Sequence, residues 1–292
     1  METNDPLVSL LIPRANMARG MLHAARATMG SLPMVARALL KRARKPIKII
    51  VDQRATTGST DCETMIRLPR VPLPRNENDV EAALSLAAMM YGLIHHEVGH
   101  CNHSDAEPMR QARPGLEQTL LNIIEDVRME LAHIRDMPNA RAYLDALNLV
   151  MHRQGRWAGE TDPSQPVLAF LNYVMMHLNA VYRLDPSAKA VLAQNGASLE
   201  TAFSPAMRQS LDALLTRLPS LQDSHDSLRL TKDVVSLLQQ EQQAAQEQQK
   251  KDSDTAEQSD DGEGDPEPQS TGDAPQDSDA GKDDGSSDED SD

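Results

Sequence analysis

The spacing of apolar residues along most of this chain is typical of α-helices. From Asn78 to about Lys250 the apolar residues recur every three or four positions, and short stretches rich in proline and glycine separate the helical segments. We expect one helix at about 78–101 that is apolar on nearly every side and therefore buried. We expect a second, amphipathic helix at about 115–135. The predicted fold class is mainly α.

One region has the composition of β-strands. Ile47–Asp52 and Thr64–Leu68 are β-prone runs on either side of a Thr/Gly/Ser turn, and three prolines follow the second run. This pattern predicts a β-hairpin over 47–68, which would form a small edge sheet before the buried helix. We assign the hairpin and the following helices to one domain at 47–250.

Residues 1–46 form a basic N-terminal segment. Its pattern predicts one or two helices, with a break near Gly30 and Pro33. Arginines on such a helix are more typical of a solvated face than of a nucleic-acid interface. Binding to nucleic acid is therefore not expected.

The net charge of −15 comes from one end of the chain. Of the 44 acidic residues, 17 lie in 252–292, a stretch with a single lysine and no Leu, Ile, Val or aromatic residue. Such a segment cannot bury enough apolar surface to offset the entropy lost on ordering, so we expect a disordered acidic tail at 251–292. The tail is an interaction arm, an interdomain linker or only a solubilising segment.

The cysteines, the N-terminal sequence and the length of the apolar runs indicate the cellular compartment. Its two cysteines do not form a disulfide framework and fit a reducing environment. The first residues lack the pattern of a secretory signal, and no uncharged apolar run has the length of a membrane span. We expect a soluble cytoplasmic protein with no membrane contact.

The stretch LIHHEVGHCNHSD, residues 93–105, carries the most specific chemistry. It contains an HExxH motif formed by His96, Glu97 and His100. Histidines four positions apart share one helix face, so both imidazoles can hold a single zinc ion. Glu97 can then act as a general base on a water molecule whose pKa the zinc lowers. Because HExxH also arises by chance, a third ligand is required.

The 115–135 helix offers that ligand. Glu125 follows His100 after 24 intervening residues, enough for a loop and a helix that packs back. Two histidines and one glutamate leave a fourth position open, which is typical of catalytic zinc. Asn122, Asp126 and Arg128 are close enough in sequence to hold the ligands by hydrogen bonds, with Asp126 as the partner of a histidine.

Other polar residues in this part of the chain are assigned to the surroundings. His95 projects about 100° away from His96 around the helix axis and is expected to support the site or lie at the surface. His103 and Asp105 are rival third ligands, but the short-spacing zinc motif needs a glycine and a histidine that the chain lacks there. Glu130 lies off the face of the proposed glutamate ligand and is interpreted as a surface charge.

At His96–His100 together with Asn122–Glu125, the chain resembles the gluzincin branch of zinc metallopeptidases. More narrowly, HHEVGH followed by LNIIEDVRME is similar to the pattern of bacterial and phage proteins described as cobaltochelatase CobT-like. In those proteins a zincin-like helical region precedes an acidic linker and a von Willebrand A (VWA) domain. The resemblance covers roughly 45–250 and is tight only at the two motifs.

This resemblance implies a zincin-like fold for 47–250. It also implies that His96, His100 and Glu125 are zinc ligands and that Glu97 is the catalytic base. No DxSxS motif followed by a folded segment is present, so either a VWA partner would be a separate protein or the protein works without one.

Two functions follow as hypotheses. The first is a zinc metallopeptidase that hydrolyses a peptide or protein substrate, with Glu97 activating water and passing the proton to the leaving amine. The alternative is a non-catalytic zincin-like adapter or CobT-like assembly subunit, whose acidic tail recruits an AAA+ ATPase or a VWA protein. A helical protein with a chance motif is the third interpretation.

Overall fold

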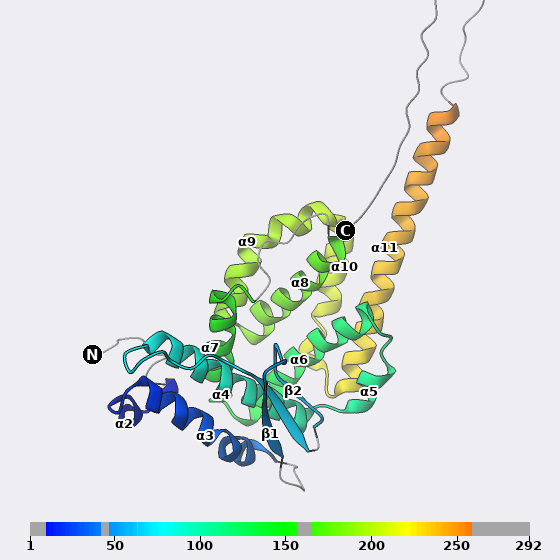
Figure 1. The fold of residues 1–292 in the computed structure, drawn as a ribbon. Coiled ribbons are helices and arrows are strands. Elements are labelled where there is room, and N and C mark those ends of the chain that lie inside the picture. The colour runs from blue at the N-terminus through cyan, green and yellow to red at the C-terminus, as the bar shows by residue number, and fades with distance from the viewer. Residues whose placement is uncertain (1–9, 42–46, 63, 157–164, 259–292) are drawn as a thin grey trace, which may run out of the picture. The chain divides into compact units, whose positions relative to one another are not determined.

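The computed structural model describes residues 10–41, 47–62, 64–156 and 165–258 (Figure 1). It is mainly helical and contains a small three-stranded sheet. One compact unit comprises Met1–Ala244, and a second comprises Ala245–Asp292. Within the described ranges, no helix combines the length and apolar character needed to cross a membrane.

The helices follow one another along the chain with short connections. Their bounds are α2 (Arg14–Met17), α3 (Met21–Leu39), α4 (Val80–His103), α5 (Ala106–Gln111), α6 (Leu116–Asp136), α7 (Ala140–Arg153), α8 (Pro166–Leu178), the π-helical segment η1 (Asn179–Arg183), α9 (Pro186–Ala202), α10 (Pro205–Leu215), the 3-10 turn η2 (Leu218–Ser220) and α11 (Ser224–Gln258). The predicted helices at 78–101 and 115–135 correspond to α4 and α6, so their existence and approximate bounds are confirmed.

The helix α4 is the centre of the first apolar cluster. It begins after Asp79, whose side chain accepts a hydrogen bond from the backbone N–H of Ala82 and caps the helix. The helices α3, α6 and α7 and the sheet pack against it (Figure 1). At Gly99 an added Cβ would lie 2.2 Å from Sδ of Met129, so glycine allows α6 to approach α4 closely. This approach brings the residues of α6 to the HExxH motif.

The strands do not form the predicted hairpin. The strand β1 (Lys48–Asp52) pairs in parallel with β3 (Met65–Pro69), and the two-residue strand β2 (Ser59–Thr60) pairs antiparallel with β3 on its other side. The side chain of Asp61 accepts hydrogen bonds from the backbone of Thr64 and Met65, which closes a tight turn between β2 and β3. The chain passes from β1 into β2 and then turns back into β3. Both β1 and β3 therefore run opposite to β2, and they pair with each other in parallel.

The basic N-terminal segment is part of the first cluster. The helix α3 runs through Gly30 and Pro33 without a break, contrary to prediction. Proline removes one helical hydrogen bond, but Leu32 and Ala36 on either side of it are buried in the same apolar cluster as α4. Burial of this face outweighs the local cost and keeps the helix continuous.

The helix α6 lies between two apolar clusters. Its Leu120, Ile124 and Val127 are buried in a second cluster, to which α8, α10 and α11 contribute. Its Met129 meets Gly99 of α4. The rotation of α6 about its axis is thus determined by packing on both sides.

The helix α11 extends to Gln258. The first residues of the segment predicted to be disordered are therefore helical, which fits the good helix propensity of the Gln, Ala, Glu and Lys residues before them. The rest of that prediction, for residues 259–292, lies outside the described residues.

Candidate metal centre

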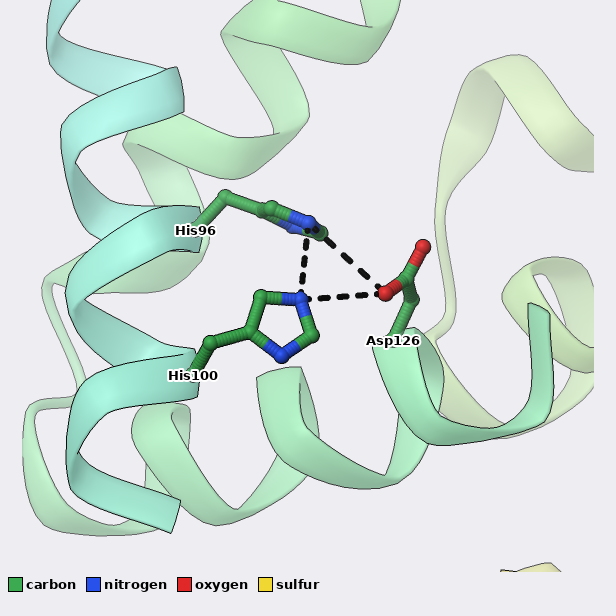
Figure 2. A group of neighbouring side chains, drawn as sticks. All are labelled: His96, His100 and Asp126. Carbon is green, nitrogen blue, oxygen red and sulfur yellow. Dashed lines mark hydrogen bonds and ion pairs between the residues drawn. The ribbon is translucent and has the colours of Figure 1, made fainter. Parts of the chain in front are cut away.

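Three side chains converge between α4 and α6 (Figure 2). Nε2 of His100 lies 3.2 Å from Nε2 of His96 and 3.1 Å from Oδ1 of Asp126. Nε2 of His96 lies 3.8 Å from the same Oδ1. The three atoms could hold one metal ion.

The spacing of these atoms fits a tetrahedral site. Ligand atoms about 2.0–2.2 Å from a zinc ion at tetrahedral angles lie about 3.3 Å apart. Two of the distances in the structure, 3.1 and 3.2 Å, are slightly shorter than this value, and the third, 3.8 Å, is longer. Two imidazole nitrogens and one carboxylate oxygen also form a donor set that suits zinc, and they leave a fourth position open.

A buried carboxylate orients His96. Nδ1 of His96 is 2.9 Å from Oε1 of Glu130, and Oε2 of Glu130 forms an ion pair of 3.1 Å with Nε of Arg183. Glu130 is 7% exposed and Arg183 is fully buried. Because an ionised carboxylate only accepts hydrogen bonds, Nδ1 of His96 donates and its Nε2 is directed to the metal position. The prediction that Glu130 is a surface charge is wrong.

A hydroxyl orients His100 in the same sense. The Ser104 hydroxyl donates to Oε1 of Glu125 at 2.6 Å and lies 3.0 Å from Nδ1 of His100. Since the hydroxyl proton is committed to Glu125, Nδ1 of His100 is the donor in the second contact. Its Nε2 is therefore also free to bind a metal. Glu125 supports the centre indirectly, through Ser104.

Glu125 does not lie at the metal position where it was predicted. Its carboxylate is 1% exposed and accepts hydrogen bonds from Nε and a terminal NH₂ of Arg128 and from the hydroxyls of Ser224 and Ser227 on α11. Burial disfavours its charge, but the hydrogen bonds and charge of Arg128 outweigh burial and hold the pKa of Glu125 below its ordinary value. The structure brings Asp126, expected only as a supporting residue, to the two histidines instead.

The exchange of roles follows from the rotation of α6. Neighbouring residues on a helix point about 100° apart, so Glu125 and Asp126 cannot both reach the Nε2 atoms of the two histidines. Asp126 and Glu130 are four positions apart on α6 and therefore lie on one face of that helix. His96 and His100 have the same spacing on α4, so the two pairs can face each other. This matched spacing was present in the sequence and would have favoured Asp126.

The other expected supporting residues have different roles. Asn122 is exposed on α6. Arg128 is buried and also donates to the backbone oxygen of His103 at 2.7 Å, so it connects Glu125 to the end of α4. His95 is buried on another face of α4, where its Nδ1 is 3.2 Å from Nε2 of His133.

The charges around His96 favour a cation at the centre. Burial alone would lower its pKa, but the hydrogen bond to Glu130 and the negative charges of Asp126, Glu130 and Glu97 raise the pKa of His96 to about 10. Both Nδ1 atoms of the two histidines are donors to other groups. The two facing Nε2 atoms therefore need a proton or a metal ion between them.

Glu97 lies next to this cationic position and under the sheet connection. It is 3% exposed, and a Cβ added to Gly58 would lie 2.3 Å from its Oε1. Burial raises the pKa of Glu97 above its ordinary value, while the nearby His96 and His100 oppose the shift. Glycine at position 58 is what allows the connection between β1 and β2 to cover this carboxylate.

The connection between β1 and β2 is attached to the end of α7. Arg156 donates to the backbone oxygen of Thr56. Thr57 borders a cavity of about 160 Å³ that is also lined by His96, Asp126 and Glu130. His96 and Asp126 of the metal centre therefore face this cavity.

Comparison with known proteins adds no assignment. No protein-family model, no curated protein and no solved structure matches the chain.

Proposed function

We propose that this protein is a zinc-dependent peptidase of the HExxH type, in which His96, His100 and Asp126 bind the metal. The observation that carries the proposal is the convergence of these three donors within 4.8 Å of one another, with a buried glutamate beside the two histidines. When bound, zinc would supply a Lewis acid that polarises a carbonyl and lowers the pKa of a water molecule.

The protein residues have distinct roles in this proposal. Glu130 and Ser104 fix the rings of His96 and His100 so that both Nε2 atoms face the metal. Glu97 accepts a proton from the attacking water and then gives it to the leaving amine. Its raised pKa suits this task, because a base that must later donate its proton works best with a pKa nearer neutrality.

The test separates metal binding from proton transfer. Glu97→Gln keeps the size of the side chain and removes the carboxylate, so we expect zinc content equal to that of the wild type. Hydrolysis of a mixed peptide library, followed by mass spectrometry, should fall by about 10²–10⁴-fold. His100→Ala serves as the second variant and should lose both zinc and hydrolysis.

Two outcomes would overturn the proposal. Equal hydrolysis by the wild type and Glu97→Gln would show that the glutamate is not the base. Stoichiometric zinc in a wild-type protein that hydrolyses no peptide would indicate a structural metal centre, as expected for the adapter hypothesis.

A further inference from the structure

The cavity beside the metal centre has no role in the mechanism proposed above. Its volume is about 160 Å³, and its walls come from α4, α6, α7, α8, η1 and the connection between β1 and β2. His96 and Asp126 lie in its wall, so the cavity opens directly onto the metal position. A substrate held at the metal would therefore place its nearest side chain at this opening.

Most of the cavity wall is apolar. The apolar side chains are Leu93, Ile123, Val127, Leu147, Met151 and Met175. Burial of an aliphatic side chain against such a wall is favourable because it removes CH₂ groups from water. Methionines also adapt their shape to different aliphatic groups.

Three polar residues of the wall, Asn148, Asn179 and Glu130, have partners in the protein. Asn148 donates to Asp185 at 2.6 Å, and Asn179 donates to the backbone oxygen of Met175 at 2.9 Å. Glu130 is paired with His96 and with Arg183, which lies behind the wall.

A charged side chain would therefore gain little in the cavity. The residues that line it include no lysine or arginine, so an acidic side chain would find no counter-charge. A basic side chain would compete with the metal ion for Asp126 and with Arg183 for Glu130. An acidic side chain would thus be buried without a counter-charge, and a basic one would find only carboxylates that already have partners, so both kinds are disfavoured.

The size of the cavity suits a single side chain. Clefts that hold whole small molecules have volumes of about 300–1,000 Å³. A single water molecule needs only about 10–15 Å³. At about 160 Å³ the cavity lies between these limits and has room for a side chain with a few carbon atoms.

We propose that this cavity binds the substrate side chain next to the cleaved bond and selects an uncharged aliphatic one of leucine or methionine size. The inference rests on the proposed peptidase function, because it requires a peptide at the metal centre. It goes further by naming the class of residue that the substrate must carry there.

Amino-acid hydroxamates test this selection without turnover. The hydroxamate group binds zinc and holds the side chain beside it, so titration calorimetry of the zinc-loaded protein measures the contribution of the cavity. Leucine hydroxamate should bind at least about tenfold more tightly than glycine hydroxamate, which corresponds to ~1.4 kcal/mol. Aspartate hydroxamate should bind no more tightly than glycine hydroxamate. Equal affinities for leucine and glycine hydroxamates, or a preference for aspartate hydroxamate, would overturn the proposal.

Two variants connect the preference to the cavity. Ile123→Phe fills the space and should abolish the preference for leucine hydroxamate, whereas Val167→Phe at an exposed position of α8 should keep it. Met151→Ala enlarges the space and should shift the preference towards phenylalanine hydroxamate. If a folded, zinc-loaded Met151→Ala or Ile123→Phe protein keeps the wild-type preference, the cavity is not the binding site.

The failure of this inference and that of the peptidase proposal are distinguishable. Selective hydroxamate binding without hydrolysis of any peptide would reject the peptidase function and keep the cavity as a side-chain site. Hydrolysis of peptides with no hydroxamate selectivity would keep the peptidase function and reject the cavity as the side-chain site.

Discussion

The helix α4 contributes to two histidine pairs with the same nitrogen–nitrogen distance and very different surroundings. The Nε2 atoms of His96 and His100 are 3.2 Å apart, and Nδ1 of His95 is also 3.2 Å from Nε2 of His133. The first pair faces Asp126, and Glu130 accepts a hydrogen bond from Nδ1 of His96. The second pair is buried, and the ring of His95 stacks on Tyr143 with ring centres 4.7 Å apart.

The surroundings give the two pairs opposite preferences for charge. Carboxylates overcome burial and raise the pKa of His96 to about 10. Burial, together with a neighbouring histidine, lowers the pKa of His95 and that of His133 to about 4. One pair favours a cation and the other excludes it. The comparison indicates that the carboxylates of α6, and not the spacing of the histidines, distinguish the candidate metal site from the second pair.

The largest expected effect is on metal binding by the first pair. His100→Ala should abolish stoichiometric zinc binding, because only two of the three donors remain. His133→Gln changes the second pair and should keep the zinc content of the wild type. Metal analysis of the three purified proteins checks both expectations. Equal loss of zinc in the two variants would contradict the distinction between the pairs.

The next prediction separates the two neighbouring acids on α6. Glu125→Ala leaves the buried Arg128 without its carboxylate, so the free energy of unfolding should fall by about 3–5 kcal/mol. Asp126→Ala removes a partly exposed carboxylate, so it should leave stability within about 0.5 kcal/mol of the wild type and abolish zinc binding. Urea unfolding of the metal-free proteins and metal analysis measure these effects. Loss of zinc in a folded Glu125→Ala protein, with zinc retained in Asp126→Ala, would restore Glu125 as the ligand.

A third prediction concerns the pH dependence that the second pair imparts. The pKa of His133 is about 4 in the folded protein and 6.5 ordinarily, so the unfolded chain binds a proton that the folded protein excludes. The stabilising contribution is complete above pH 6.5 and is lost as the pH falls towards 4. The loss is on the order of 3 kcal/mol.

Urea unfolding at about pH 7, 5.5 and 4.5 tests this sign. The His133→Gln protein should show a smaller fall in stability over the same range than the wild type. An unchanged slope would mean that His133 is protonated without cost in the folded protein.

The smallest expected effect concerns the orientation of His96. Glu130→Gln replaces a charged acceptor with a neutral amide, which should weaken zinc binding by about 10–100-fold. The matched control is Glu107→Gln, at an exposed position on α5. Competition with a chromogenic chelator measures both affinities. An affinity equal to that of the control would show that Glu130 does not tune the site.

Local features of the sequence were sufficient to predict the main helices and half of the centre. Apolar spacing located α4 and α6 to within two residues at each end, because helix periodicity depends on neighbours along the chain. The same periodicity placed His96 and His100 on one face. The sequence also offered the matching pair Asp126 and Glu130, which the prediction did not use.

Features that depend on distant residues were not predicted. The parallel pairing of β1 with β3 depends on β2 entering the sheet first. The partner of Glu130 is Arg183, which comes from η1 far along the chain. No local pattern of apolar residues specifies either contact.

The sequence by itself determined the helical class, the HExxH helix and the presence of acids on the helix that faces it. Only the tertiary structure decided which acid reaches the histidines. A helix carries its residues at constant angular intervals, but its rotation about its own axis is determined by the surfaces that pack against it. For α6 these surfaces are Gly99 of α4 on one side and Ser224 and Ser227 of α11 on the other, and together they direct Glu125 inward and Asp126 to the metal position.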